Sequence, residues 1–309
     1  MENENFAAID IGSNGARLLI KNVNEDSVGN YEFSKVLFLR IPLRLGKDVF
    51  TLGKVSKERE RMMMCMMKSF KQLMKLYRVK TYRAYATSAM RDAENGKKIM
   101  KKIKKETGIE LEIIGGQKEA QLLYNNAIEA ADVMGGNYAY MDVGGGSTEI
   151  TMMSYGKKVG SCSYNVGTLR MLCGAVDEGT IERLKNDMAE YAKNYKDITI
   201  IGSGGNINKL CELYNSKTTG DRKDILPVAN LIKLHNDLKP LSVKDRMEKF
   251  DLKSDRADVI VPAAELFIIV AESLGSKKIL VPNISLADSI IDGLYKDGKE
   301  KEEAENEKK

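Results

Sequence analysis

Short apolar runs alternate along this chain with longer stretches in which apolar residues recur every three or four positions. The first two runs, Phe6–Ile11 and Arg17–Val23, predict a buried strand and its antiparallel partner. Further elements are expected in alternation: a helix from Ser56 to Leu76, a strand over 81–86, helices over 97–106 and 117–134, and strands over 109–114 and 138–143. Alternation of this kind is typical of α/β proteins, in which helices cover the faces of a sheet.

The pattern that opens the chain returns near its middle. Residues 6–14 read FAAIDIGSN, and residues 138–147 read YAYMDVGGGS. Each is an apolar strand followed by Asp, a β-branched residue, Gly and a Gly/Ser turn, and the two aspartates are 142 − 10 = 132 residues apart. We interpret this as a duplicated domain rather than as two unrelated hairpins. The expected division is a first domain over 1–120, a second over 121–295, and a charged tail over 296–309 that frays or is disordered.

The two turns share the chemistry of a phosphate site. Glycines let the backbone turn sharply and approach a ligand closely, and successive backbone N–H groups form an anion-binding concavity. A third glycine turn over 202–205 joins a strand to the start of a helix, which indicates a further anion site; the alternative is a tight connection without a ligand. The candidate phosphate-binding residues are Gly12, Ser13 and Asn14 of the first turn, Gly144, Gly145, Gly146, Ser147 and Thr148 of the second, and Ser203 and Gly204 of the third.

An aspartate beside each of the first two turns indicates a metal. Asp10 and Asp142 would repel a bare phosphate, so their placement makes sense only beside a divalent cation. Arg17 and Arg91 are the best candidates for clamping phosphate, since a guanidinium group binds phosphate through two parallel hydrogen bonds. Two such loops facing each other across a cleft would hold a polyphosphate and its metal between them.

Composition limits which partners and which cellular compartment are expected. The net charge of +5 is compatible with an acidic ligand but falls well short of a nucleic-acid-binding signature, so no nucleic acid partner is expected. No stretch has the length of a membrane-spanning helix and none resembles a signal peptide, so no membrane association is expected. The four cysteines lack CxxC spacing, and we interpret them as thiols in a reducing cytoplasm. The single histidine excludes a site built on several histidines.

Several segments together resemble one known family. They include Ala8-Ile-Asp-Ile-Gly-Ser-Asn14, Ala86-Thr-Ser-Ala-Met-Arg-Asp-Ala93, the Glu119-Ala120 pair, Asp142-Val-Gly-Gly-Gly-Ser-Thr-Glu149 and Gly167-Thr-Leu-Arg170. On these segments the chain is similar to the exopolyphosphatase/guanosine pentaphosphate phosphohydrolase (Ppx/GppA) family, over about residues 6 to 295. The resemblance implies an α/β fold of two duplicated ribonuclease-H-like domains, the actin-like ATPase superfold, with a cleft between the domains.

The resemblance also suggests what individual carboxylates do. On pattern alone Glu119 would count as an ordinary charge at a helix start, where the helix dipole favours the ionised form. The resemblance assigns it the role of catalytic base, which requires a carboxylate within reach of the attacking water. Asp142 and Glu149 resemble the metal-linked carboxylates of the family, and Asp10 is the first-domain counterpart that would help them. The expected cofactor is Mg²⁺ or Mn²⁺, because magnesium needs only one or two protein carboxylates.

Lysines crowd the predicted helix over 97–106. Six of them occupy positions 97, 98, 101, 102, 104 and 105. We interpret this set as a solvated helix face; the alternative is a funnel that attracts polyanions.

The function expected from these observations is a metal-dependent exopolyphosphatase that releases terminal orthophosphate from inorganic polyphosphate. Two alternatives stay open: hydrolysis of the 5′ phosphate of guanosine pentaphosphate, and a non-catalytic regulator that binds polyphosphate or alarmones. Short chains are the expected preference, because Ala287 replaces the arginine of the usual closing motif and the tail carries several glutamates. Asn206 and Pro262 also depart from the family pattern, and the sequence leaves open whether the protein is a homodimer.

Overall fold

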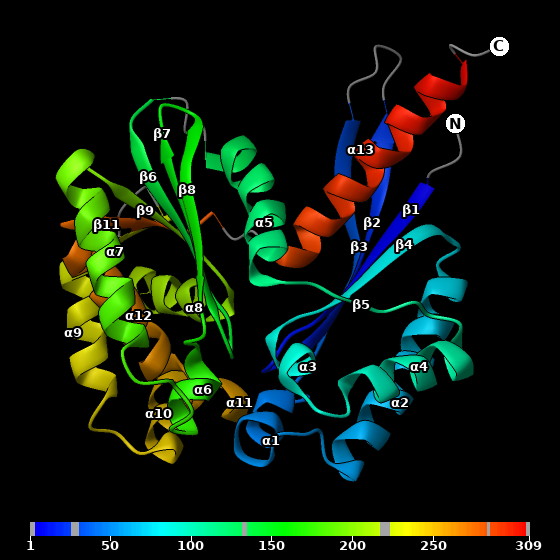
Figure 1. The fold of residues 1–309 in the computed structure, drawn as a ribbon, viewed down its shortest axis with the longest axis horizontal. Coiled ribbons are helices and arrows are strands. Elements are labelled where there is room, and N and C mark those ends of the chain that lie inside the picture. The colour runs from blue at the N-terminus through cyan, green and yellow to red at the C-terminus, as the bar shows by residue number, and fades with distance from the viewer. Residues whose placement is uncertain (1–3, 26–30, 132–134, 217–222, 283–284, 307–309) are drawn as a thin grey trace. The chain divides into compact units, whose positions relative to one another are not determined.

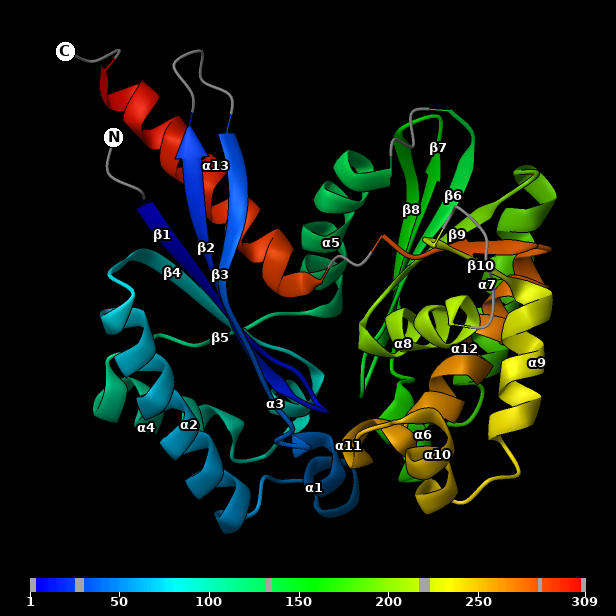
Figure 2. The same ribbon diagram turned by 180° about the vertical axis from the view of Figure 1, so that it is seen from behind.

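Figure 1 and Figure 2 show the fold in a computed structural model, which describes residues 4–25, 31–131, 135–216, 223–282 and 285–306. The chain forms two compact units. One comprises Met1–Gly115 together with Leu286–Lys309, and the other comprises Gly116–Ser285. Each unit is built on its own mixed β-sheet with helices packed against it.

The first unit contains a five-stranded sheet in the order β3-β2-β1-β4-β5. Its elements are β1 (Glu4–Ile11), β2 (Ala16–Glu25), β3 (Tyr31–Ile41), α1 (Leu45–Leu52), α2 (Lys57–Leu76), β4 (Val79–Ala86), α3 (Ser88–Asp92), α4 (Gly96–Thr107), β5 (Glu112–Ile113) and α13 (Leu286–Asn306). One face of the sheet packs on α2 and α4 through a core that includes Ile9, Met67 and Ile103. The other face carries α13, whose Tyr295 ring lies 5.7 Å from the ring of Phe6, because successive strand residues point to opposite faces.

The second unit contains a six-stranded sheet in the order β10-β11-β9-β6-β7-β8. Its elements are α5 (Gly116–Ala131), β6 (Asn137–Val143), β7 (Thr148–Ser154), β8 (Lys157–Tyr164), α6 (Thr168–Leu172), α7 (Thr180–Asn194), β9 (Thr199–Ser203), α8 (Gly205–Asn215), β10 (Ile225–Pro227), α9 (Val228–Leu238), α10 (Val243–Phe250), α11 (Ser254–Ala257), α12 (Ile260–Leu274) and β11 (Lys278–Leu280). The long apolar helix α12 packs on α7, α8 and α9 at the centre of this unit's core. Helix α5 packs on β7 and β8.

The two units repeat one topology, which confirms the predicted fold class. Each contains three successive antiparallel strands, which in the second unit follow α5, then two helices, and then a strand parallel to the first of the three, which is β4 in one unit and β9 in the other. The register repeats as well: Asp10 lies opposite Arg17, and Asp142 lies opposite Glu149. Arg17 and Glu149 therefore occupy equivalent places in the two units, although one is a cation and the other an anion.

The turns of the two hairpins also share one geometry. The N–H of Gly12 donates to the carbonyl oxygen of Gly15 at 3.0 Å, and the N–H of Gly144 donates to that of Ser147 at 3.0 Å. The two glycine turns that the sequence analysis aligned are therefore the same turn in three dimensions.

Some boundaries differ from those expected. The division between the units falls at Gly115, and residues 286–295, expected in the second domain, belong with the first unit. The tail expected to fray is helical as far as Asn306, because α13 continues through it. The strand expected over 109–114 is only two residues long, and the end of the helix expected over 117–134 lies outside the described residues.

Candidate active site

Three carboxylates gather in the second unit. One oxygen from each of Glu119, Asp142 and Glu149 lies within 4.8 Å of the others. Glu119 and Glu149 are buried, with 6% and 1% of their surface exposed. Three negative charges this close repel one another, so the group is stable when a cation or a shared proton offsets the repulsion. Carboxylate oxygens are the donors that Mg²⁺ and Mn²⁺ prefer, so the residues present fit the expected metal.

Sheet register and one serine orient the cluster. Asp142 on β6 lies opposite Glu149 on β7, which in turn lies opposite Ser163 on β8. Ser163 Oγ donates a hydrogen bond to Glu149 Oε1 at 2.9 Å, which fixes the orientation of that carboxylate. Glu119 comes from a different element, the first turn of α5.

Gly116, the first residue of α5, allows that helix to approach the cluster. A Cβ atom at this position would overlap the side chain of Ser163 and lie 3.1 Å from Glu149 Oε1. A larger residue would therefore displace the start of α5, and Glu119 with it, from β8. The sequence pattern does not predict this role, because Gly116 falls between the strand expected over 109–114 and the helix expected over 117–134.

The second glycine loop directs its amides away from α6. Three consecutive carbonyl oxygens accept hydrogen bonds from the start of that helix: Gly144 from Thr168 N at 3.0 Å, Gly145 from Leu169 N at 2.8 Å, and Gly146 from Arg170 Nε at 2.8 Å. In a trans peptide the N–H points opposite to the C=O, so the amides of residues 145–147 face the other way. Successive amides arranged in this manner form an anion-binding concavity. Phosphate binding by this loop stays a prediction, and this arrangement of amides is compatible with it.

Thr148 and Gly167 pin the loop to the protein. Thr148 Oγ1 donates to the carbonyl oxygen of Val166 at 2.6 Å, so this hydroxyl supports the loop from within. A Cβ atom at Gly167 would lie 2.6 Å from Gly146 N and 2.7 Å from Ser147 N. Real Cβ atoms do not approach backbone this closely, so only glycine permits the loop to pack here.

We expect Gly167→Ala to lower phosphate release about a hundredfold while the protein stays folded, because the added methyl group must push the loop from its place and small misplacements of binding groups cost on this order. The measurement is kcat/KM for phosphate release, with thermal unfolding as the check on folding. Gly293→Ala is the matched control, since nothing lies within 4 Å of a methyl group added there. Equal activity of the two variants would mean that this loop does not bind substrate.

The first glycine loop is held in the same way within its own unit. The carbonyl oxygen of Asn14 accepts from Arg44 N at 2.9 Å, and that of Ser13 accepts from Gly46 N at 2.8 Å. The Ser13 hydroxyl lies 2.8 Å from Ser88 Oγ and accepts from the N–H of Ala89 at 3.2 Å. The Ser13 side chain thus joins the loop to the start of α3.

The two arginines and the aspartate expected to bind ligands at the first loop form an ion pair and a hydrogen bond within the protein. Arg17 forms an ion pair with Asp10, which is 1% exposed. Arg91 donates from one guanidinium nitrogen to the carbonyl oxygen of Ile114 at 3.3 Å. Phosphate clamping by the two arginines and metal binding by Asp10 stay predictions.

The third glycine turn meets the acidic cluster from the neighbouring strand. Ser203 on β9 lies opposite Asp142 on β6. Gly204 has φ +106° and ψ 154°, a conformation that is essentially restricted to glycine, and a Cβ atom there would lie 3.4 Å from Asp142 Oδ1. A Cβ atom at Gly205 would lie 2.8 Å from Arg256, so that guanidinium group rests against the turn. Ser203 and Gly204 are predicted from the sequence, whereas the position of Arg256 beside this loop is not.

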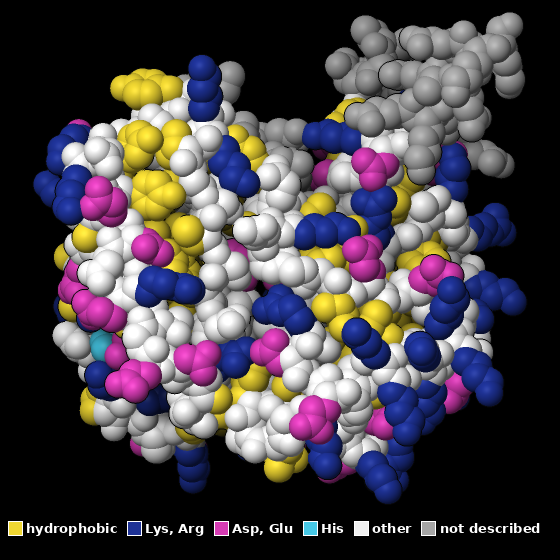
Figure 3. Space-filling view, in the orientation of Figure 1, with side chains coloured by type: hydrophobic (Ala, Val, Ile, Leu, Met, Phe, Trp, Pro, Cys, Tyr) yellow, Lys and Arg dark blue, Asp and Glu magenta, His cyan; other side chains and the backbone are white. Residues whose placement is uncertain are grey.

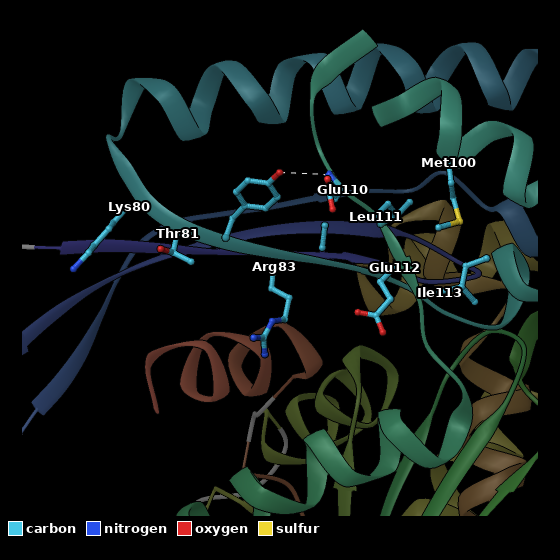
Figure 4. Close-up of a pocket in the computed structure, with 10 residues that line it drawn as sticks. Lys80, Thr81, Arg83, Met100, Glu110, Leu111, Glu112 and Ile113 are labelled. Atoms are coloured by element: carbon cyan, nitrogen blue, oxygen red, sulfur yellow. Dashed lines mark hydrogen bonds between the residues drawn. The ribbon is translucent and has the colours of Figure 1, made fainter. Parts of the chain in front are cut away.

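A cavity of about 730 Å³ lies elsewhere, in the first unit (Figure 4). It opens between β4 and the segment over 110–113, where the N–H of Glu110 donates to Tyr82 Oη at 3.4 Å. Its charged lining is mixed, with Lys80 and Arg83 beside Glu110 and Glu112. None of the predicted site residues lines it, and the mixed charge does not favour a phosphate chain.

Comparison with protein families places the chain in one of them. The model of the Ppx/GppA phosphatase family matches residues 23–297. The chain therefore belongs to the Ppx/GppA phosphatase family, which confirms the resemblance drawn from the sequence.

Among the described residues, no helix is long and apolar enough to cross a membrane.

Individual relatives carry names of enzymes that act on phosphate compounds. The chain is 30% identical over 321 residues to a bifunctional 3-dehydroquinate synthase/phosphatase of Fusobacterium nucleatum, covering 93% of this chain and only 46% of that protein. It is 28% identical over 309 residues to exopolyphosphatase 2 of Mycobacterium tuberculosis, covering 92% of this chain and 96% of that protein. It is also 23% identical over 302 residues to a guanosine-5'-triphosphate,3'-diphosphate pyrophosphatase of Aeromonas hydrophila, covering 94% of this chain and 59% of that protein.

A solved structure shows the same fold. The crystal structure of an exopolyphosphatase from Cytophaga hutchinsonii superposes with a TM-score of 0.81 at 22% identity, covering 94% of this chain and 97% of that one. The relatives from Mycobacterium tuberculosis and Aeromonas hydrophila carry names of hydrolases of phosphoric anhydride bonds, which is the enzyme class expected from the sequence.

Proposed function

We propose that this protein is a metal-dependent exopolyphosphatase that removes terminal orthophosphate from short chains of inorganic polyphosphate. The observation that carries the proposal is the cluster of Glu119, Asp142 and Glu149 beside a glycine loop whose amides form an anion site. Phosphoryl transfer needs mostly positioning and neutralisation of charge, and this inventory supplies both. The likeness to exopolyphosphatase 2 over nearly the full length of both chains supports the same assignment.

The roles of the residues follow from their chemistry. The amides of residues 145–147 hold the oxygens of the terminal phosphate, where negative charge builds during the reaction. Glu119 accepts a proton from water as the water oxygen bonds to the terminal phosphorus and the bond to the bridging oxygen breaks. Asp142 and Glu149 would hold a divalent cation, which neutralises charge on the phosphate oxygens. The products are orthophosphate and a chain shorter by one unit.

A second candidate is hydrolysis of guanosine pentaphosphate. The likeness to the Aeromonas hydrophila pyrophosphatase, which covers 94% of this chain, favours it. The same loops and carboxylates would act on the 5′ phosphate, so the two candidates differ only in what holds the rest of the substrate. A purely regulatory role is less well supported, because the chain keeps all three carboxylates together.

Phosphate release from three substrates tests the proposal. With short polyphosphate, polyphosphate of several hundred units and guanosine pentaphosphate at one salt concentration, we expect the highest kcat/KM per chain end on short polyphosphate. A higher value on guanosine pentaphosphate would favour the second candidate. No phosphate from any of the three, in the presence of Mg²⁺ or Mn²⁺, would overturn both.

A further inference from the structure

Helix α4 of the first unit carries a charge pattern that the fold does not require. It holds six lysines and a single acidic residue, Glu106. At 3.6 residues per turn, Lys97, Lys98, Lys101 and Lys105 fall within about 100° of arc on one side of the helix. We call these four residues the lysine ridge. The residues that bury the helix, including Ile99 and Ile103, lie on the opposite side.

Charged residues on both sides of the lysine ridge form ion pairs with neighbouring elements. On the side of α2, Lys102 pairs with Glu60 and Glu106 pairs with Lys68, both at 2.7 Å. On the side of β5, Lys104 pairs with Glu110 at 2.6 Å. Within the described part of the chain, no carboxylate forms an ion pair with a lysine of the ridge. In Figure 3, Lys and Arg side chains gather over the region of α2 and α4.

The ridge opposes the stability of its own helix. Lysines three and four residues apart repel one another, as in the pairs Lys97–Lys101 and Lys101–Lys105. Lys97 and Lys98 also lie in the first turn, where the helix dipole disfavours positive charge, and that turn contains no acidic residue. A bound polyanion would offset both effects.

A short structural path joins the ridge to the first glycine loop. Ser13 of the loop is held by Ser88 and Ala89 at the start of α3. Gly96, which begins α4, packs so closely on the carbonyl oxygen of Met90 that any Cβ atom there would clash. The end of α4 that carries Lys97 is therefore fixed against the helix that anchors the loop.

We propose that the lysine ridge binds the part of the polyphosphate chain that extends past the first glycine loop. This proposal rests on the proposed function and limits the length of chain over which added phosphates increase affinity. The ridge spans eight residue steps, or about 12 Å of helix, so it adds affinity as a chain becomes long enough to contact it. Once the chain exceeds that length, further units gain nothing from the ridge.

The test neutralises the ridge and follows KM against chain length. In the ridge variant, Lys97, Lys98, Lys101 and Lys105 are all replaced by Gln; the control variant carries the same change at Lys185, Lys233, Lys239 and Lys249, which are exposed in the second unit. For the wild type, we expect KM per chain end to fall, within the range of short chains, from the shortest chain to those that span the ridge, and to fall no further for longer chains. Exposed ion pairs contribute modestly, so loss of four should raise KM for the longer chains about tenfold in the ridge variant alone. Its kcat, its KM for the shortest chain and its thermal stability should be unchanged or, for stability, slightly raised.

Two results would overturn the inference while leaving the proposed function intact. One is an equal dependence of KM on chain length in the ridge and control variants. The other is displacement of labelled polyphosphate from wild-type protein by single-stranded RNA of the same total charge at lower concentration, which would assign the ridge to another polyanion. Failure of the wild type to hydrolyse polyphosphate at all would instead overturn the proposed function. Direct binding of labelled polyphosphate to the ridge and control variants would then decide the role of the ridge separately.

Discussion

Replacing Glu119 with glutamine is expected to remove most phosphate release and to leave the fold and polyphosphate binding intact. The substitution keeps the size of a side chain that is 6% exposed and packed beside Asp142 and Glu149. It removes the carboxylate that accepts the proton of water, and general bases of this kind contribute roughly 10²–10⁴-fold to rate. The measurement is kcat for phosphate release together with the affinity for labelled polyphosphate.

Glu182→Gln is the matched control for this variant. Glu182 also lies in the first turn of a helix, α7, but it is exposed. The control should keep wild-type activity. If Glu119→Gln retained activity within about threefold of wild type, against the loss expected of a general base, Glu119 could not be the base, and its place in the cluster would indicate metal binding alone.

The second large effect concerns the metal. Activity should disappear in excess chelator and return with Mg²⁺ or Mn²⁺. Asp142→Asn and Glu149→Gln should each raise the metal concentration needed for half-maximal activity by more than about tenfold, since even the loss of a residue that only supports a ligand costs 10–100-fold in affinity. Asp237→Asn, at an exposed position on α9, should not change it.

Asp10→Asn separates two roles that the sequence could not distinguish. Asp10 pairs with Arg17 in the first unit. If Asp10 also binds the metal, its variant should shift the metal requirement as Asp142→Asn does. Full activity of all these variants in chelator would rule out a metal-dependent mechanism.

The repeated hairpin shows how far sequence reasoning reaches. Strand, turn and returning strand are local, so the pattern around Asp10 and Asp142 is sufficient to predict the same turn twice, and the structure has it twice. The sequence could not show that the residues opposite these aspartates give the two turns different electrostatics. Arg17 neutralises Asp10, whereas Glu149 adds a second negative charge beside Asp142.

The return of α13 to the first unit illustrates a different limit. Its apolar residues predict burial without saying against which sheet. Tyr295 packs on Phe6, and Lys21 of β2 pairs with Asp288 at 2.9 Å, so contacts between the two ends of the chain decide the division into units. A single domain boundary placed along the sequence cannot predict a unit that combines residues from both ends of the chain.

The sequence by itself determined the duplicated α/β fold and the glycine turns, because each is written in short stretches of neighbouring residues, and the family resemblance added the candidate carboxylates. Only the tertiary structure decided which of these residues lie together. Glu119 reaches Glu149 because Gly116 lets α5 lie against Ser163, and the amides of the second loop turn outward because Gly167 and Arg170 hold its other side. These contacts join residues from separate elements, and close packing between elements depends on shape in three dimensions, which periodicity along a chain does not encode.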